Sequence, residues 1–193
     1  MIVIKLGGSL YSSLYLKEWV DGLASIDKQI IIIVPGGGPF ADQVRQAYHN
    51  WEIDEEMAHE MGVLSMQQYA SLIFSINKNI SRIDSISSLC SNNKSNIMVW
   101  FPYKDVMELC SYPKSWDVTS DSISLWLANE IGAKKLCLVK SAEIDGLSPN
   151  QIINSNIVDE YFPNIIDNFN GKTFFYNANA IKKFISDIAC GKF

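Results

Sequence analysis

The chain has 193 residues, of which 48% are hydrophobic and 19% charged, and its formal net charge is −5. This length predicts one domain with a sizeable core, and the acidic balance excludes a basic surface for nucleic acid or for an anionic membrane. Apolar runs such as Ile30 to Val34 are too short to span a bilayer, and the first residues lack the pattern of a signal peptide. We therefore expect a cytoplasmic protein. The cysteines and histidines do not cluster, so no metal centre is predicted.

The first stretch that predicts a binding site is Ile2 to Leu10. An apolar, β-branched run that contains Lys5 ends in Gly7, Gly8 and Ser9, which is typical of a buried strand that opens into a loop. Adjacent glycines let backbone amides point inward at an anion, and a lysine can follow a moving phosphoryl group. The loop is therefore a candidate phosphate site, although an ordinary turn explains it equally well on its own.

The next segments repeat this pattern. Helical spacing of apolar residues predicts a helix over 13–25, and the almost unbroken apolar run at 29–34 predicts a strand covered on both faces. That strand ends at Gly36, Gly37 and Gly38, and a helix is expected over 40–48. Such a βαβ unit is right-handed, so both glycine loops should lie at the carboxyl edge of an open, mostly parallel sheet. Two loops at one crevice predict two anionic ligands, or one ligand with two anionic ends.

The remaining segments continue the alternation of helix and strand. Residues 54–74 read as one long helix with acidic residues in its first turn, and its methionines are expected to pack in the core or in a dimer. Residues 75–95 predict only short helix and loop. The fold class is therefore α/β, a three-layer sandwich around a mostly parallel open sheet. Further strands are expected at 97–101, 135–139 and 173–176, and further helices at 102–109, 122–131, 158–169 and 178–190.

Four short motifs follow one another along the chain: Lys-Leu-Gly-Gly-Ser at 5–9, Pro-Gly-Gly-Gly-Pro at 35–39, Thr-Ser-Asp at 119–121 and Glu-Ile-Asp-Gly at 143–146. Together and in this order they resemble the amino acid kinase family, which includes acetylglutamate kinase, aspartokinase, uridylate kinase and isopentenyl phosphate kinase. The resemblance implies one domain over 1–193, with an acceptor-binding half at about 1–110 and a nucleotide-binding half at about 111–193.

Within the family, the short length, Ser115-Trp116 and the stretch at 158–163 are similar to a branch of small archaeal-type kinases. That branch serves methanofuran biosynthesis and phosphorylates aminomethylfuranylmethyl phosphate to the diphosphate. The implied activity is therefore an ATP-dependent kinase that acts on a small phosphate monoester. Mg²⁺ is expected to bridge the phosphates of ATP, largely without dedicated protein ligands.

The resemblance assigns catalytic roles to two residues. Lys5 would bind the transferring phosphoryl group, and Asp121 would orient Lys5 by a charge-assisted hydrogen bond, unless Asp121 only caps a helix. The nucleotide would be held by Gly7, Gly8, Ser9, Lys140, Asp145 and Gly146. The acceptor would be held by Gly36, Gly37, Gly38, His59, Thr119 and Ser120, with His59 on its phosphate.

One departure from the family pattern leaves the activity open. Many members carry a late lysine that balances phosphate charge, and this chain has Asp167 there, with Lys140 as a candidate substitute. The departure motivates a non-catalytic relic that binds a phosphorylated ligand or a partner. Uridylate kinase is a further alternative, although the acceptor stretch has few basic residues. The family resemblance also implies a homo-oligomer.

Overall fold

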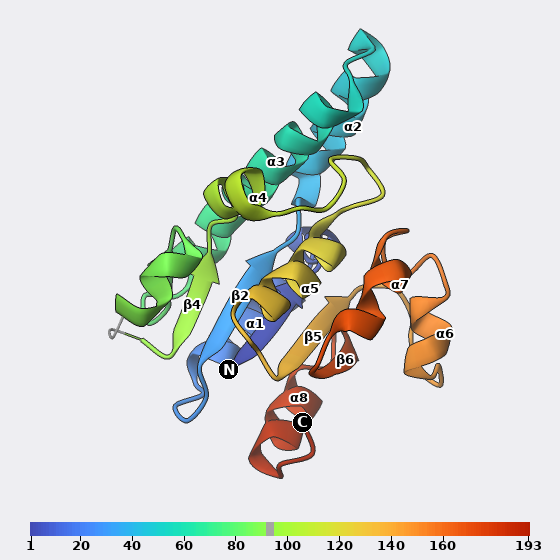
Figure 1. Cartoon of the computed structure of the whole chain (residues 1–193). Helices are drawn as coiled ribbons and strands as arrows, with labels where there is room; N and C mark the ends of the chain where they lie inside the picture. The colour runs from blue at the N-terminus through green and yellow to red at the C-terminus, as the bar shows by residue number, and fades with distance from the viewer. Residues whose placement is uncertain (92–94) are drawn as a thin grey trace.

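A six-stranded sheet forms the centre of the computed structural model, which describes residues 1–91 and 95–193 (Figure 1). Every pair of neighbouring strands is parallel, and the strand order is β3-β4-β2-β1-β5-β6. The first strand of the chain is therefore central. The strands are β1 (Ile2–Leu6), β2 (Ile31–Pro35), β3 (Ser81–Ile83), β4 (Ile97–Trp100), β5 (Lys135–Lys140) and β6 (Lys172–Asn177).

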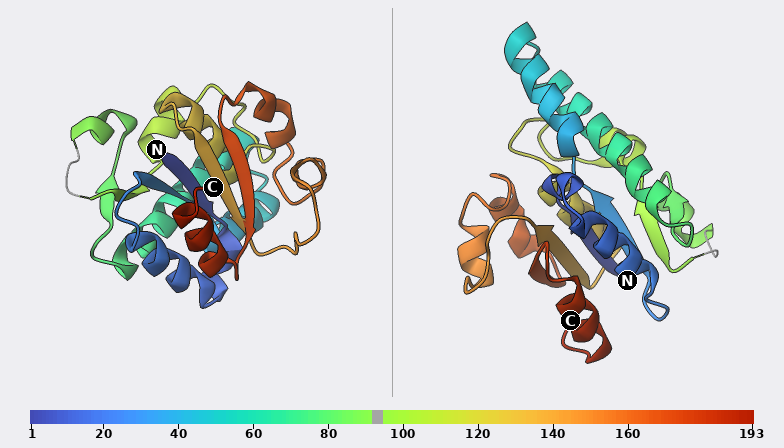
Figure 2. Two further views of the ribbon diagram at one scale, coloured as in Figure 1. Left: turned by 90° about the horizontal axis from the view of Figure 1, so that it is seen from below. Right: turned by 180° about the vertical axis from the view of Figure 1, so that it is seen from behind.

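Helices cover both faces of this sheet, which makes the predicted three-layer sandwich. α1 and α8 pack on one face, and α5 and α7 pack on the other (Figure 2). Three short 3-10 segments complete the described elements: η1 (Gly8–Ser12), η2 (Ile86–Ser91) and η3 (Ile166–Asn168). The helices are α1 (Tyr15–Ala24), α2 (Gly38–Trp51), α3 (Glu55–Ile76), α4 (Tyr103–Leu109), α5 (Ser120–Glu130), α6 (Pro149–Ile153), α7 (Phe162–Ile165) and α8 (Ile181–Ala189).

The strands are apolar almost throughout because side chains alternate between two buried faces. In β1, Ile2 and Ile4 face the core beneath α1 and α8, whereas Val3 faces the core beneath α5. Lys5 is two residues after Val3, so its charged side chain lies on the same face of the sheet, beneath α5.

In the described part of the chain, no helix combines the length and apolarity needed to cross a membrane.

The sequence predictions were confirmed for the long elements and wrong for several short ones. The edge strand β3 was missed, as was α6, and the helix expected over 158–169 is reduced to α7 followed by η3. β3 is only three residues long and has one buried side chain, so it lacks a periodic signal. Part of the segment predicted as short helix and loop, residues 92–94, lies outside the described residues.

The methionines of α3 were expected to pack in the core or in a dimer, and the structure places some of them in the core and some on the surface. Met57 and Leu64 are exposed, whereas Ala58, Val63 and Met66 on the opposite side are buried. The acidic first turn is as predicted, because the Asp54 side chain accepts a hydrogen bond from the Met57 backbone N–H at 2.8 Å. α3 therefore leaves an apolar strip on the surface of the protein.

Candidate active site

Two lysines reach the same point from neighbouring strands. Lys5 lies near the end of β1, and Lys140 is the last residue of β5. Leu6 pairs with Val139 in the parallel register, so the two lysines share a face of the sheet at its carboxyl edge. α5 begins at Ser120 over this face and carries Asp121 in its first turn. The topology therefore brings a carboxylate to two ammonium groups that are 135 residues apart in sequence.

Asp121 binds both lysines. Lys5 Nζ lies 2.9 Å from Asp121 Oδ1, and Lys140 Nζ donates to Oδ2 at 2.5 Å. All three residues are buried, with 3% exposure at Asp121. Burial alone would raise the pKa of this carboxyl, but the attraction of Lys5 and Lys140 outweighs it and holds the pKa to about 2. Asp121 thus stays ionised. Its side chain acts as the counter-ion of two lysines and does not serve only as a helix cap.

With both lysines protonated, the cluster of Lys5, Asp121 and Lys140 carries a net positive charge. Burial, followed by repulsion from Lys5, lowers the pKa of Lys140 to about 8. A net cation in a low-dielectric position attracts an anion strongly, and the fixed carboxylate prevents either lysine from moving away. The geometry therefore suits stabilisation of negative charge at the end of β1.

The two glycine-rich loops touch beside this cluster. A side-chain carbon on Gly36 would lie 2.4 Å from the Gly8 backbone nitrogen, and one on Gly8 would lie 2.5 Å from the Gly38 nitrogen. Glycine is required at both positions because backbone meets backbone. Gly38 also has a φ of 58° where it starts α2, which favours glycine. The prediction that both loops meet at one edge of the sheet is confirmed.

The loop after β5 joins the first glycine loop. Ser9 Oγ lies 2.6 Å from Ser141 Oγ, and this contact connects the start of the chain to the exit of β5. Asp145 lies farther along the same loop, where Asn177 Nδ2 donates to its carboxylate at 3.4 Å. Ser141 was not singled out by the sequence, because a lone serine after a strand carries no signal.

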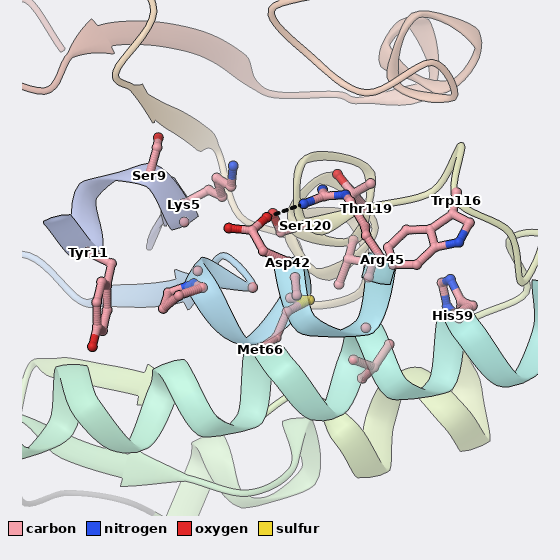
Figure 3. Close-up of a pocket in the computed structure, with 18 of the residues that line it drawn as sticks. Lys5, Ser9, Tyr11, Asp42, Arg45, His59, Met66, Trp116, Thr119 and Ser120 are labelled. Atoms are coloured by element: carbon pink, nitrogen blue, oxygen red, sulfur yellow. Dashed lines mark hydrogen bonds and ion pairs between the residues drawn. The ribbon is translucent and has the colours of Figure 1, made fainter. Parts of the chain in front are cut away.

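A cavity of about 360 Å³ opens beside the glycine loops, which is within the size range of small-molecule sites (Figure 3). Lys5 and Ser9 line one part of it, and His59 and Trp116 line another. Gly8, Gly37, Gly38, Thr119 and Ser120 also line this cavity, whereas Gly7, Gly36, Lys140, Asp145 and Gly146 do not. The residues predicted for the acceptor are thus largely gathered here, and most of those predicted for the nucleotide lie outside it.

His59 enters the cavity from α3. Its Nδ1 lies 3.1 Å from the Ser115 carbonyl oxygen, so this nitrogen carries the proton of a neutral ring. Burial lowers the pKa of His59, the hydrogen bond to Ser115 offsets part of this decrease, and the positive charge of Lys114 adds a smaller decrease. Tyr69, ten residues later on α3, packs near Gly38, so His59 lies about 15 Å farther along the helix axis. His59 and Lys5 are therefore well separated along the cavity (Figure 3).

Asp159 positions the start of α5, and sequence reasoning did not identify this role. Its carboxylate accepts hydrogen bonds from the backbone N–H groups of Thr119 and Ser122 at 2.9 and 3.0 Å, and from both of their hydroxyls. It also accepts from the Phe162 N–H at 3.0 Å at the start of α7. The Thr119 hydroxyl donates to Asp159 and makes no capping hydrogen bond to α5. One carboxylate therefore caps two helices and fixes the turn before Asp121.

We expect Asp159→Ala to lower the free energy of unfolding by about 2 kcal/mol, because two helix starts lose their cap at once. Urea unfolding followed by circular dichroism measures this loss. Glu160→Ala is the matched control, since the neighbouring Glu160 is exposed and should change stability by less than about 0.5 kcal/mol. Equal stability of the two variants would contradict the capping role.

The position expected to hold a late lysine carries no cation. Asp167 is an exposed residue of η3, and none of the ion pairs among the described residues includes it. Lys140 instead supplies a second buried cation beside Lys5 and Asp121, and its role as the substitute stays a prediction. The departure at Asp167 therefore does not leave Lys5 as the sole cation of the cluster.

Comparisons with known proteins agree with this geometry. Residues 1–160 match the model of the amino acid kinase family. The chain is 27% identical over 207 aligned positions to [5-(aminomethyl)furan-3-yl]methyl phosphate kinase of Methanocaldococcus jannaschii, covering 100% of this chain and 94% of the relative. Both comparisons extend over the glycine loops and the Lys5, Asp121 and Lys140 cluster.

Solved structures share the fold at low sequence identity. The uridylate kinase of Archaeoglobus fulgidus superposes with a TM-score of 0.73 at 16% identity, covering 97% of this chain and 95% of that one. Carbamate kinase from Giardia lamblia bound to AMP-PNP superposes with a TM-score of 0.51 at 13% identity, covering 99% and 95%. These structures confirm the predicted fold, and the chain is a phosphotransferase that belongs to the amino acid kinase family.

Proposed function

We propose that this protein transfers the terminal phosphoryl group of ATP to aminomethylfuranylmethyl phosphate, as a step of methanofuran-type coenzyme biosynthesis. The observation that carries the proposal is the buried cluster of Lys5, Asp121 and Lys140, which lies where two glycine loops meet. The relative from M. jannaschii supports the choice of acceptor, because that kinase is named for this phosphate monoester.

In the proposed reaction, an oxygen of the acceptor's phosphate attacks the γ-phosphorus of ATP, the bond from that phosphorus to the bridging oxygen breaks, and ADP leaves. No general base is needed, since a phosphate monoester has lost its second proton near pH 6. Asp121 is held ionised by two lysines, so its role is to hold Lys5 and Lys140 in position. Lys5 and Lys140 stabilise the charge that spreads over the transferring group.

ATP would be held on the side of Lys5 that includes Gly7, Gly8 and Ser9, with Ser141, Asp145 and Gly146 on the loop after β5. The contact of Ser9 with Ser141 places these two loops together. Mg²⁺ would neutralise part of the charge of the ATP phosphates. Asp121 would not hold this ion, because both of its carboxylate oxygens already contact lysines.

The acceptor would occupy the 360 Å³ cavity with its phosphate at Gly37, Gly38 and Lys5. Gly38 starts α2, whose N-terminal dipole favours an anion. Ser120 and Thr119 line the same cavity from the start of α5. The contact of His59 with the acceptor's phosphate stays a prediction; the position of His59 along α3 favours the opposite end of the acceptor.

The test is release of ADP by the purified protein with Mg-ATP and aminomethylfuranylmethyl phosphate, in parallel with UMP. We expect turnover that depends on the furan acceptor and exceeds turnover with UMP. Faster turnover with UMP would favour the uridylate kinase alternative, for which the fold of the A. fulgidus enzyme is the supporting observation. Absence of turnover with both acceptors would overturn the proposed function.

Activity should fall at alkaline pH as Lys140 loses its proton. The pKa of this ammonium is lowered to about 8, so kcat/KM is expected to decrease as the pH rises through 8. Lys140→Arg keeps the charge because guanidinium does not titrate in this range, and this variant should lose the alkaline decrease. Initial rates from pH 6.5 to 9.5 measure both profiles. Identical profiles would show that Lys140 does not supply the required charge.

We also propose a cytoplasmic homo-oligomer that uses α3. Met57 and Phe74 on this helix are 47% and 39% exposed, and Leu64 lies between them in sequence at 40%. An apolar strip of this kind is typical of an interface between subunits. Light scattering of Leu64→Glu beside the natural protein tests it, since a charge in a buried interface should yield monomers. An unchanged mass would exclude this surface as the interface.

A further inference from the structure

The cavity is lined by an acidic side chain, Asp42, about one helical turn from its glycine loop. Gly38, Asp42 and Arg45 all line it from α2. Their spacing of four and three residues places them along one face of the helix. Asp42 therefore lies about 6 Å along the helix axis from Gly38. An acceptor with its phosphate at Gly38 would bring its other end level with Asp42.

Asp42 is the one carboxylate among the residues that line this cavity. Its Oδ1 accepts a hydrogen bond from Arg45 Nη1 at 2.6 Å, and among the described residues Arg45 is its only ion-pair partner. The side chain is 62% exposed, so a second donor can approach its other oxygen. Figure 3 shows this pair beside Thr119 and Ser120.

Arg45 and Trp116 form the rest of this end of the cavity. The Arg45 guanidinium lies 5.5 Å from the centre of the Trp116 ring, which it approaches in a cation–π contact. The same guanidinium contacts Asp42 at Oδ1, so it holds this carboxylate in place, and a second donor can approach Oδ2. Burial lowers the pKa of His59, which disfavours a further positive charge on this wall.

The middle of the cavity is apolar. Val63 and Met66 line it from α3, and Ile123 lines it from α5. Such walls favour a small ring or hydrocarbon between two polar ends. The lining therefore has an anion-binding end at Lys5, an apolar middle and an acidic group one turn along α2.

We propose that Asp42 binds a cationic amine of the acceptor and selects phosphate monoesters that carry such an amine across a small apolar ring. This inference rests on the proposed function and assigns recognition of the aminomethyl group to Asp42. The ammonium would donate to Asp42 while the phosphate lies at Gly38 and Lys5. Acceptors without the amine would leave the carboxylate with Arg45 alone and bind less well.

Asp42→Asn tests the proposal with two acceptors, aminomethylfuranylmethyl phosphate and the analogue that has a methyl in place of the aminomethyl group. The natural protein should prefer the amine by about tenfold or more in kcat/KM, which is the range of one hydrogen bond between charged groups. In the variant, kcat/KM for the amine acceptor should fall and most of the preference should be lost. The kcat/KM for the methyl analogue should stay unchanged within about twofold.

Two further variants make the result specific. Asp84→Asn is the matched control, because Asp84 is 61% exposed and also pairs with an arginine, Arg82. It should leave both acceptors unaffected. Asp42→Asn alone leaves the positive charge of Arg45 without its counter-ion. The double variant with Arg45→Gln removes that charge as well, and it should still show no preference for the amine. Recovery of the preference in this double variant would mean that repulsion by Arg45, and not a missing contact, caused the loss.

The failures of the two proposals can be told apart. If the natural protein phosphorylates neither acceptor, the proposed function is wrong. If it phosphorylates both with equal efficiency, or if Asp42→Asn weakens both equally, the kinase stands and the role of Asp42 is overturned.

Discussion

Lys5→Ala is expected to lower kcat by at least about 10³-fold, the range found when a cation that faces a transferring phosphoryl group is removed. Lys5 is buried at the meeting point of both glycine loops, so water or a surface lysine cannot replace it. The fold should persist, because Asp121 keeps its ion pair with Lys140. Initial rates of ADP release at saturating Mg-ATP and acceptor measure the loss, and thermal unfolding checks the fold.

Lys17→Ala is the control for this prediction. Lys17 forms an ion pair with Asp21 on the surface of α1, and its side chain is 70% exposed. Its removal should change neither kcat nor thermal stability appreciably. Retention of more than about one tenth of kcat by Lys5→Ala would exclude the role assigned to Lys5.

The largest combined effect on stability and rate is expected for Asp121→Asn. The substitution leaves Lys5 and Lys140 buried without their shared counter-ion, which should lower the free energy of unfolding by about 3–5 kcal/mol at pH 7. The rate should fall more than the affinity for acceptor, because the lysines lose their fixed positions. Urea unfolding and steady-state kinetics measure the two effects.

The pH dependence of this contribution has a defined sign. The pKa of Asp121 is lowered from 3.8 to about 2 on folding, so the carboxyl stabilises the native state fully above about pH 4. That contribution is lost as the pH falls through 2. Asp84→Asn, at an exposed ion pair with Arg82, is the control and should have a small effect on stability. If Asp121→Asn proved as stable as Asp84→Asn, the buried cluster would not stabilise the fold as predicted.

The sequence predicted the parts of the site that follow from local pattern. An apolar run that ends in glycines marks both the end of a strand and a loop where backbones approach, so β1, β2 and their loops could be inferred together. Because parallel strands share a carboxyl edge, Lys5 and the second glycine loop were expected at one crevice. The structure confirms this juxtaposition through the contact of Gly8 with Gly36 and Gly38.

Contacts between distant segments could not be predicted in the same way. Asp159 reaches Thr119 and Ser122 across 40 and 37 residues, and Ser9 reaches Ser141 across 132. Single polar residues in loops have no periodicity, so nothing in the sequence indicates which helix they will cap. The sequence left open which side of α3 packs in the core for a related reason: this helix is apolar on several sides, and its pattern does not show which side the core covers.

The most direct test of the central claim is phosphorus NMR of the product formed from Mg-ATP and aminomethylfuranylmethyl phosphate. We expect the single resonance of the monoester to be replaced by two coupled resonances of a diphosphate, with one ADP formed for each molecule converted, and we expect Lys5→Ala to form neither. ADP without the diphosphate, or a diphosphate formed equally by Lys5→Ala, would contradict the proposed reaction.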